Sequence, residues 1–422
     1  MKTSSRDWSD IDHNIESNEF FRTEEYHETF REIRNEDPVH YSGGSVYGRP
    51  LWHLMRYNDI AAYLSDNTTF SSRHGGNLPP DPNRLLNLTE QERYDAGFGS
   101  SSTFTDAPRH PLLRQPMNKH FSVPAVARLT ETIRRVTKQI VNEVEDRGTC
   151  DLVEDVAAQL PMRLVCEYMG VPRQDWDILR SFAQTYMGST DPQFRREGMS
   201  EAKSQATARD DLYEYMKALA IDKRRNPGDD FTTVISSMMI EGEPWNDRDM
   251  GWWCFSMIAG GLETTRNAGA TGMYTLIRNP DQADRIRQDY SLMPKAVEEI
   301  LRWATPSKHK LRVATRDVEL GGQLIRKDDW VVGWLISANR DEEIFDDPYK
   351  FDIARDPNPH MAFGVNTGGH YCLGRNLARL ELKVLIEELL RRFGTIELDG
   401  APEWLASSNT AGLKHLPIRC RA

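Results

Sequence analysis

The decisive stretch of this sequence is FGVNTGGHYCLG at Phe363–Gly374, which runs directly into a charged amphipathic segment beginning at Arg375. Its glycines let the backbone fold closely around a ligand, and a helix N-terminus carries partial positive charge that favours the thiolate form of Cys372. A single thiolate facing a flat cofactor is the axial arrangement of one class of haem enzyme. A lone cysteine is also among the most buried residues of protein cores. Cys372 alone therefore leaves both interpretations open.

The composition excludes several classes of protein. The chain has 53 basic and 64 acidic residues, a net charge of −11 and no long basic run, which argues against nucleic acid as a partner. The sequence has no apolar signal-peptide core at its start and no uncharged apolar run of membrane-spanning length. We therefore expect a cytoplasmic protein with no membrane partner. The cysteines are scattered without a C-x-x-C pair, which predicts neither disulfides nor a zinc or iron–sulfur site; they are Cys150, Cys166, Cys254, Cys372 and Cys420.

Helical patterns dominate the chain, and β patterns are short. Helices are expected over residues 18–36, 59–64, 126–148, 151–168, 174–187, 199–224, 230–240, 247–279 and 374–392, and strands over 51–55, 311–314 and 318–325. Residues 71–105 are rich in Gly, Pro, Ser and Asn, which indicates a binding loop or lid, with a disordered excursion as the alternative. We expect one mainly α domain with small β-sheets over residues 1–422, in which residues 1–17 are loosely ordered.

The helix expected over 247–279 breaks local rules at its centre, where the sequence reads Ala259-Gly-Gly-Leu-Glu-Thr-Thr265. Two glycines each cost a helix about 1 kcal/mol relative to alanine, and a buried glutamate is costly unless it is paired. Gly260 would let a ligand approach the backbone, while the Thr264 hydroxyl can bond a backbone carbonyl and open the helix to water. With Glu263 beside it, this groove could deliver protons into an apolar pocket. The alternative is close helix packing through small residues.

Charged residues form two further pairs at helical spacing. His110 and Arg114 lie four residues apart and would share one helix face, where they suit an anionic ligand group or form a solvated surface pair. Glu299 and Arg302 lie three apart, which by itself indicates a surface ion pair.

Taken together and in this order, these features resemble the cytochrome P450 family of haem-thiolate monooxygenases over about residues 18–418. The resemblance implies a mainly α fold with small β-sheets, in which haem lies between the long central helix and the cysteine loop with its following helix. It implies that Cys372 is the metal ligand and that Glu263 and Thr264 are the catalytic acid–alcohol pair. Its structural triad would be Glu299, Arg302 and Arg355. The implied haem-binding residues are His110, Arg114, Gly260, Arg312, Phe363, His370, Cys372 and Gly374, with His360 as a further candidate for a propionate.

Two features depart from the family pattern. The family usually has seven residue steps between the Phe and the Cys, whereas Phe363 and Cys372 are nine apart, which leaves open which N–H groups reach the sulfur. Bacterial members that oxidise steroids, sterol side chains and terpenoids show the nearest likeness, yet Ser307-Lys-His-Lys310 stands where they usually have apolar pocket residues. These cations either face an acidic or hydroxylated substrate or point to solvent. By resemblance, the pocket is expected to draw on residues 78–104, 180–195, 257–265, 307–311 and 409–413.

The implied reaction is a monooxygenation that uses heme b (iron protoporphyrin IX) and a bulky lipophilic substrate, typically a hydroxylation. Epoxidation, ring coupling or dealkylation in antibiotic biosynthesis is the alternative within the family. Electrons would come from a separate ferredoxin and an NAD(P)H-dependent ferredoxin reductase, and the enzyme is expected to be a monomer. Because such partners are usually acidic, the docking face must be locally basic; candidates are Arg134, Arg135, Lys138, Arg375 and Arg379.

Two hypotheses from other classes remain. One is a haem-binding sensor or carrier without oxygenase activity, against which the Glu263-Thr264 pair speaks because a sensor needs no proton relay. The other is a cysteine-nucleophile enzyme built on Cys372 and His370, which would need no cofactor.

Overall fold

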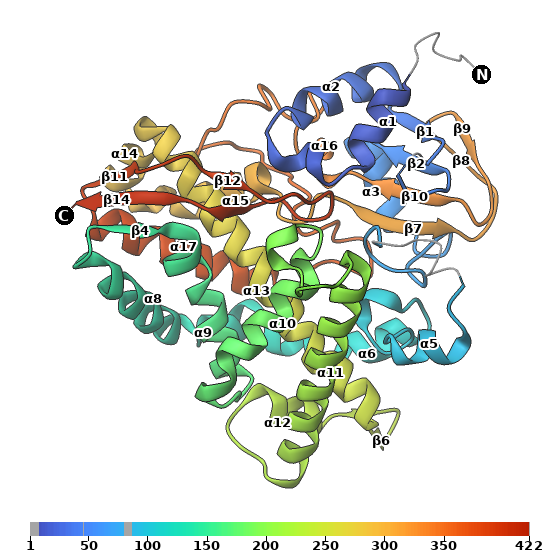
Figure 1. Ribbon diagram of the computed structural model, residues 1–422, viewed down its shortest axis with the longest axis horizontal. Helices are drawn as coiled ribbons and strands as arrows, with labels where there is room; N and C mark the ends of the chain where they lie inside the picture. The colour runs from blue at the N-terminus through green and yellow to red at the C-terminus, as the bar shows by residue number, and fades with distance from the viewer. Residues whose placement is uncertain (1–7, 45, 80–86, 422) are drawn as a thin grey trace.

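The computed structural model describes residues 8–44, 46–79 and 87–421. Helices dominate and the sheets are small (Figure 1), as the sequence predicts. In the described residues, no helix combines the length and apolar character needed to cross a membrane. The α-helices are α1 (Ser9–Glu16), α2 (Tyr26–Glu36), α3 (Tyr57–Ser65), α5 (Glu90–Asp95), α6 (Arg109–Asn118), α7 (Val123–Ala127), α8 (Thr130–Glu145), α9 (Gln159–Tyr168), α10 (Trp176–Gly188), α11 (Glu201–Arg225), α12 (Phe231–Ser236), α13 (Asp247–Arg278), α14 (Pro280–Gln288), α15 (Met293–Ala304), α16 (Leu335–Ala338) and α17 (Arg375–Arg392).

The largest sheet has the strand order β1-β2-β10-β7-β3, in which β10 runs parallel to β2 and the other neighbours are antiparallel. Its strands are β1 (Val39–Ser42), β2 (Leu51–Leu54), β3 (Phe70–Ser71), β7 (Lys310–Ala314) and β10 (Trp330–Gly333). A second sheet joins β11 (Thr395–Leu398), β14 (Pro417–Arg421) and β4 (Thr149–Asp151). The remaining strand pairs are β5 (Met239–Ile240) with β6 (Glu243–Pro244), β8 (Val318–Leu320) with β9 (Gln323–Ile325), and β12 (Glu403–Trp404) with β13 (Leu413–His415).

The start of the chain is better ordered than the sequence suggests. Residues 1–17 were expected to be loose, but α1 forms over Ser9–Glu16, and Ile15 packs with Trp8 in the cluster beside the large sheet. The buried Glu16 carboxylate accepts hydrogen bonds from the Ser42 hydroxyl at 2.5 Å and the Val46 N–H at 2.9 Å. A few well-placed contacts therefore anchor this segment despite its polar composition; residues 1–7 lie outside the described residues.

Helix α13 is the long element around which the helical half is built (Figure 1), and it matches the predicted range of 247–279. The Asn246 side chain caps it by accepting from the Asp249 N–H at 2.8 Å, and the helix stops just before Pro280. It packs against α9, α11, α15 and α17. Close approach to α15 depends on Gly272, because a Cβ there would lie 2.6 Å from the Ile300 side chain.

Glu299 and Arg302 on α15 form a fully buried ion pair rather than the surface pair that their spacing alone indicated. The guanidinium meets both carboxylate oxygens at 2.8 Å, and it also donates to the backbone carbonyls of Asn339 and Pro348. Arg355 reaches Glu299 at 3.2 Å. These three residues fasten α15 to the turn-rich segment that leads into the Phe363–Gly374 loop.

Candidate active site

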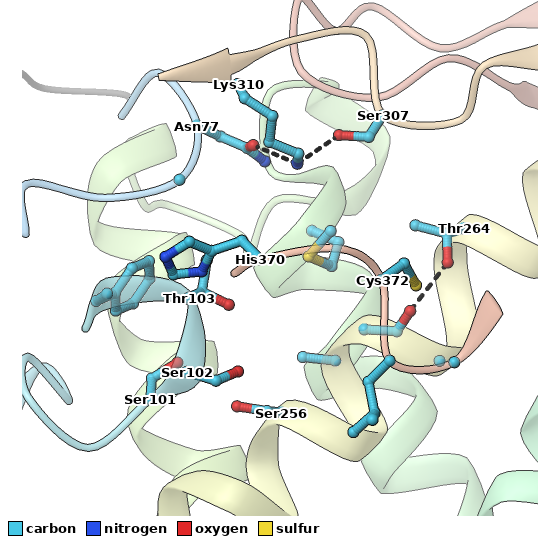
Figure 2. A pocket seen from close by; sticks show the side chains of 18 of the residues that line it. Asn77, Ser101, Ser102, Thr103, Ser256, Thr264, Ser307, Lys310, His370 and Cys372 are labelled. Carbon is cyan, nitrogen blue, oxygen red and sulfur yellow. Dashed lines mark hydrogen bonds between the residues drawn. The ribbon is translucent and has the colours of Figure 1, made fainter. Parts of the chain in front are cut away.

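A cavity of about 670 Å³ lies between α13 and the loop that carries Cys372 (Figure 2). Every pocket range expected from the sequence contributes to its lining, including Phe104, Tyr186, Met257, Lys310 and Asn409. The lining also includes residues the sequence reading missed, on α9 and α11: Val165, Tyr168, Ala202, Gln205, Ala206 and Arg209. On α11 the four-residue spacing of Ala202 and Ala206 was an available signal, because small residues on one face leave room for a ligand.

Cys372 sits at the end of the loop, immediately before α17. Its N–H donates to the Phe363 carbonyl at 3.0 Å, which closes the loop on itself. Burial raises the pKa of the thiol, while the Gly374 N–H and the nearby Arg114 guanidinium act to lower it. The site is therefore prepared for a thiolate whose desolvation cost would be offset by a bound cation.

The additional length between Phe363 and Cys372 is taken up against the C-terminal end of α3. A Cβ at Gly368 would lie 2.4 Å from the Leu64 carbonyl oxygen, so only glycine allows this approach. The Thr367 and Ser65 hydroxyls lie 2.6 Å apart. The longer loop is thus held by contacts with α3 and leaves the Phe363–Cys372 closure intact.

Across the cavity from Cys372, α13 presents a groove at Gly260. The Thr264 hydroxyl donates to the Gly260 carbonyl at 2.9 Å, as the sequence predicts (Figure 2). No atom lies within 4 Å of a Cβ built on Gly260, whereas one on Gly261 would meet Val165 at 3.2 Å. Gly260 therefore faces open space, and the helix-packing alternative applies to Gly261 alone.

Glu263 lies on a different side of α13 from Thr264 and does not line the cavity. Its carboxylate is 3.0 Å from a guanidinium nitrogen of Arg266. The same guanidinium lies 3.3 Å from Glu154, which also contacts Arg180. Glu263 is thus the inner end of a chain of alternating charges whose outer members, Glu154 and Arg180, are partly exposed.

Four basic side chains gather beside the Cys372 loop, namely His110, Arg114, Arg312 and His370. The rings of His110 and His370 lie 4.2 Å apart, and Arg114 donates to the Tyr371 carbonyl. Arg312 on β7 is buried and donates to the Leu311 carbonyl at 2.7 Å. In the described part of the chain, neither arginine has a carboxylate within ion-pair distance, and His110 Nε2 is buried without a hydrogen-bond partner. Two arginines without a carboxylate partner and a buried histidine nitrogen without a hydrogen-bond partner fit the propionates of a haem.

Burial favours the neutral form of both histidines. Burial is the main cause that lowers the pKa of His110 to about 4 and that of His370 to about 2. His370 Nε2 makes its hydrogen bond with the Ser72 hydroxyl at 3.1 Å. The structure therefore gives His370 a partner other than Cys372, which does not support the cysteine-nucleophile hypothesis.

His360, the further propionate candidate, is a wrong prediction. Its Nε2 lies 3.0 Å from a carboxylate oxygen of Glu298, and its Nδ1 accepts from the Ala362 N–H at 3.2 Å. The same glutamate binds Arg379 through two hydrogen bonds of 2.7 and 2.8 Å. Because both ring nitrogens of His360 are engaged and the residue does not line the cavity, His360 links its own loop to Glu298 on α15, and Glu298 in turn binds Arg379 on α17.

The three cations after Ser307 have three different surroundings. Lys308 is buried away from the cavity, where its ammonium donates to the carbonyls of Ser407 at 2.6 Å and Thr410 at 3.1 Å. His309 Nδ1 lies 3.1 Å from the Ser408 carbonyl. Only Lys310 lines the cavity. Lys308 and His309 therefore neither face the substrate nor point to solvent. Their hydrogen bonds connect the 306–310 wall of the cavity to the 407–411 wall.

The comparisons with known proteins agree with this geometry. A family model described as Cytochrome P450 matches residues 199–417. Among curated proteins of Mycobacterium tuberculosis, the chain is 36% identical over 404 residues to "Putative cytochrome P450 126", covering 94% of each chain. It is 35% identical over 399 residues to "Methyl-branched lipid omega-hydroxylase" (92% and 90% covered) and 32% identical over 397 residues to "Steroid C26-monooxygenase" (92% and 88% covered).

Solved structures give the same result. CYP108D1 from Novosphingobium aromaticivorans superposes with a TM-score of 0.85 at 31% identity, covering 98% of each chain. Mycobacterium marinum cytochrome P450 CYP268A2, solved in complex with pseudoionone, has a TM-score of 0.86 at 28% identity, with 99% of this chain and 100% of that one covered.

Proposed function

The chain belongs to the cytochrome P450 family, and from that membership we propose that it hydroxylates a bulky, lipophilic substrate such as a steroid, a terpenoid or a branched lipid. As a P450 monooxygenase it uses haem iron to insert one atom of O₂ into an organic substrate, and the other atom leaves as water. The observation that carries the proposal is the 670 Å³ cavity with the Cys372 loop on one side and the Gly260 groove on the other.

The proposed cofactor is heme b, whose iron supplies the oxygen chemistry when bound. Cys372 would bind its iron, and Arg114, Arg312, His110 and His370 would hold its propionates. Gly260, Phe363 and Gly374 border the space between α13 and α17 and would face the porphyrin. The four basic side chains and the Cys372 sulfur are separate features of this chain, and both fit the same cofactor.

Thr264 and Glu263 divide the proposed proton delivery between them. The Thr264 hydroxyl borders the cavity and can pass on a proton while it bonds the Gly260 carbonyl. Glu263 is held by Arg266 in the charge chain that reaches Glu154 and Arg180 near the surface. We propose that protons enter from the surface along the charge chain that ends at Glu263. Thr264, on the cavity side of α13, is then the last protein group before the cavity.

The Thr264→Val variant tests this role. We expect kcat to fall by about 10²-fold or more, the usual contribution of a positioned proton donor, because valine keeps the side-chain volume but cannot donate. Steady-state product formation measures the loss, and ligand titration should show unchanged substrate affinity. Ser256→Ala is the matched control, since Ser256 also lines the cavity from α13 and donates to the carbonyl four residues earlier, that of Trp252, at 2.7 Å. Equal losses in both variants would contradict the role assigned to Thr264.

We propose a separate ferredoxin and an NAD(P)H-dependent ferredoxin reductase as electron donors, with the enzyme acting as a single-domain monomer in the cytoplasm. Several candidate docking residues have acidic partners: Arg134 lies 3.6 Å from Glu387, and Arg135 lies 2.7 Å from Glu167. Arg379 is fastened to Glu298. Lys138 on α8 is exposed and has no ion pair among the described residues, so it can meet an acidic partner at no internal cost.

The Lys138→Glu variant should therefore slow reduction by ferredoxin about tenfold at low ionic strength, a change at the lower end of electrostatic steering effects, and the difference should shrink at high salt. Stopped-flow measurement of the formation of the ferrous carbon monoxide complex provides the rate. Lys327→Glu is the control, because Lys327 is an exposed residue in the turn between β9 and β10. Strands β9 and β10 lie on the other side of the molecule from α8 (Figure 1). Equal rates for the wild type and Lys138→Glu would exclude α8 from the docking face.

The overall proposal is tested by the absorption spectrum of the reduced carbon monoxide complex together with product analysis. A thiolate-type Soret band and a hydroxylated product from a steroid, terpenoid or branched lipid are the expected results. A histidine-type band would refute the assignment of Cys372, and a thiolate-type band without any turnover would favour the sensor or carrier.

A further inference from the structure

Lys310 places a partly buried cation in the cavity wall without an acidic partner. Its ammonium donates to Asn77 Oδ1 at 3.0 Å and to Ser307 Oγ at 2.7 Å (Figure 2). Both acceptors are neutral, and an ammonium has three N–H donors. No carboxylate of the described residues lies within ion-pair distance of Lys310. One donor therefore remains available on the cavity side.

This arrangement is costly unless an anion completes it. Burial lowers the pKa of Lys310 to about 8, so the side chain is still mostly charged at neutral pH. Lys308, by contrast, has its partners within the protein. Its ammonium donates to the carbonyls of Ser407 and Thr410 and lies 4.3 Å from the centre of the Phe21 ring. Lys310 has no such enclosure, and the accessible part of its side chain borders the cavity. An anionic group there would offset its desolvation.

Two sources could supply that anion, a haem propionate or the substrate. The arginines Arg114 and Arg312 line the cavity and already provide one cation for each propionate. Lys310 is a third cation, one more than the two propionates of a haem need. Its two hydrogen-bond partners come from the 74–79 segment and the 307–311 segment, both of which contribute to the cavity lining. Charge balance and the position of its partners both favour the substrate.

We propose that Lys310, positioned by Asn77 and Ser307, binds the carboxylate of an amphipathic acid, such as a fatty, steroid or terpenoid acid, and thereby orients this substrate in the cavity. The inference rests on the proposed function and narrows its substrate class from lipophilic compounds in general to lipophilic acids. The apolar part of such a substrate would lie along the α13 wall, which includes Phe255, Met257 and Ala259. A charge-assisted hydrogen bond in this water-poor setting would select the acid over its neutral analogues.

The test compares acids with their methyl esters on the purified holoenzyme. Hexadecanoic acid and 5β-cholanic acid are titrated against their esters, with the change in the haem spectrum as the binding signal. In the wild type, at least one acid should bind about tenfold or more tightly than its ester, the usual range for a hydrogen bond to a charged group. In Lys310→Met this preference should fall below about twofold, mainly through weaker binding of the acid, whereas Lys310→Arg should retain most of it.

Three results would overturn the inference. One is equal binding of acids and esters by the wild type, and another is an equal weakening of both ligands in Lys310→Met. The third is faster transfer of haem to apomyoglobin from Lys310→Met with the acid preference unchanged, because Lys310 would then hold a propionate. Failure of the proposed function looks different, since the wild type would then lack the thiolate-type spectrum of the carbon monoxide complex before any ligand is added.

Discussion

Replacing Cys372 with alanine is expected to abolish monooxygenase turnover and the thiolate-type Soret band of the reduced carbon monoxide complex. The sulfur is the single thiol among the cavity-lining residues that the structure describes, and thiolate ligation is what gives the haem of this enzyme class its reactivity towards O₂. Product formation should fall below detection. The loop should still form, because its closing hydrogen bond joins the Cys372 N–H to the Phe363 carbonyl and does not involve the side chain.

The matched control is Cys420→Ala, which removes a buried thiol from β14, outside the cavity lining. It should retain the spectrum and the turnover of the wild type. Turnover in Cys372→Ala at more than a trace of the wild-type rate would contradict the assignment of Cys372. An unfolded Cys372→Ala protein can be distinguished by far-UV circular dichroism, and Cys372→Ser then provides a smaller perturbation of the same atom.

The second large effect is expected at Arg302. Replacing Arg302 with methionine should lower the free energy of unfolding by about 3–5 kcal/mol, the range for breaking a buried ion pair. Glu299 would keep the Arg355 guanidinium at 3.2 Å, but it would lose the bidentate partner with which it is fully buried. The carbonyls of Asn339 and Pro348 would lose their donor as well. Denaturant unfolding followed by circular dichroism measures the change.

Arg326→Met serves as the control for Arg302. Arg326 forms an ion pair of similar length, 2.8 Å with Asp317, but both side chains are more than half exposed. This variant should cost less than about 1 kcal/mol. If the two variants cost the same, the buried pair does not fasten α15 to the segment before the cysteine loop. Because that segment leads to Cys372, we also expect Arg302→Met to bind less haem per protein molecule.

Long-range charge pairing limited what the sequence alone could predict. Helix α13 matched its expected range closely because its signals are local, namely an Asn cap and a following proline. The spacing of Glu299 and Arg302 alone predicts a surface pair, because their further partners, Asn339, Pro348 and Arg355, are distant in sequence. His360 was misassigned for the same reason, since Glu298 competes for its ring.

Two further features had sequence signals that were not used. The loop expected over 71–105 contains α5, whose capping box joins Thr89 and Glu92. Lys310 and Arg312 are two residues apart on β7, so a period of two predicts that both face the same side of the strand. Since Arg312 resembled a propionate donor, that rule would have placed Lys310 in the cavity. The enclosure of Lys308 had no comparable signal, because the carbonyls of Ser407 and Thr410 come from the end of the chain.

The link between the 306–310 and 407–411 walls affects how this scaffold can diversify. Lys308 binds the carbonyls of Ser407 and Thr410, its N–H donates to the Asn409 carbonyl at 3.0 Å, and the Ala411 N–H donates to the Pro306 carbonyl at 3.0 Å. A substitution that shifts one wall must therefore shift the other or break several hydrogen bonds at once. Residues 87–104 and α11 are not part of this linkage, so directed evolution for new substrates should accumulate its productive changes there.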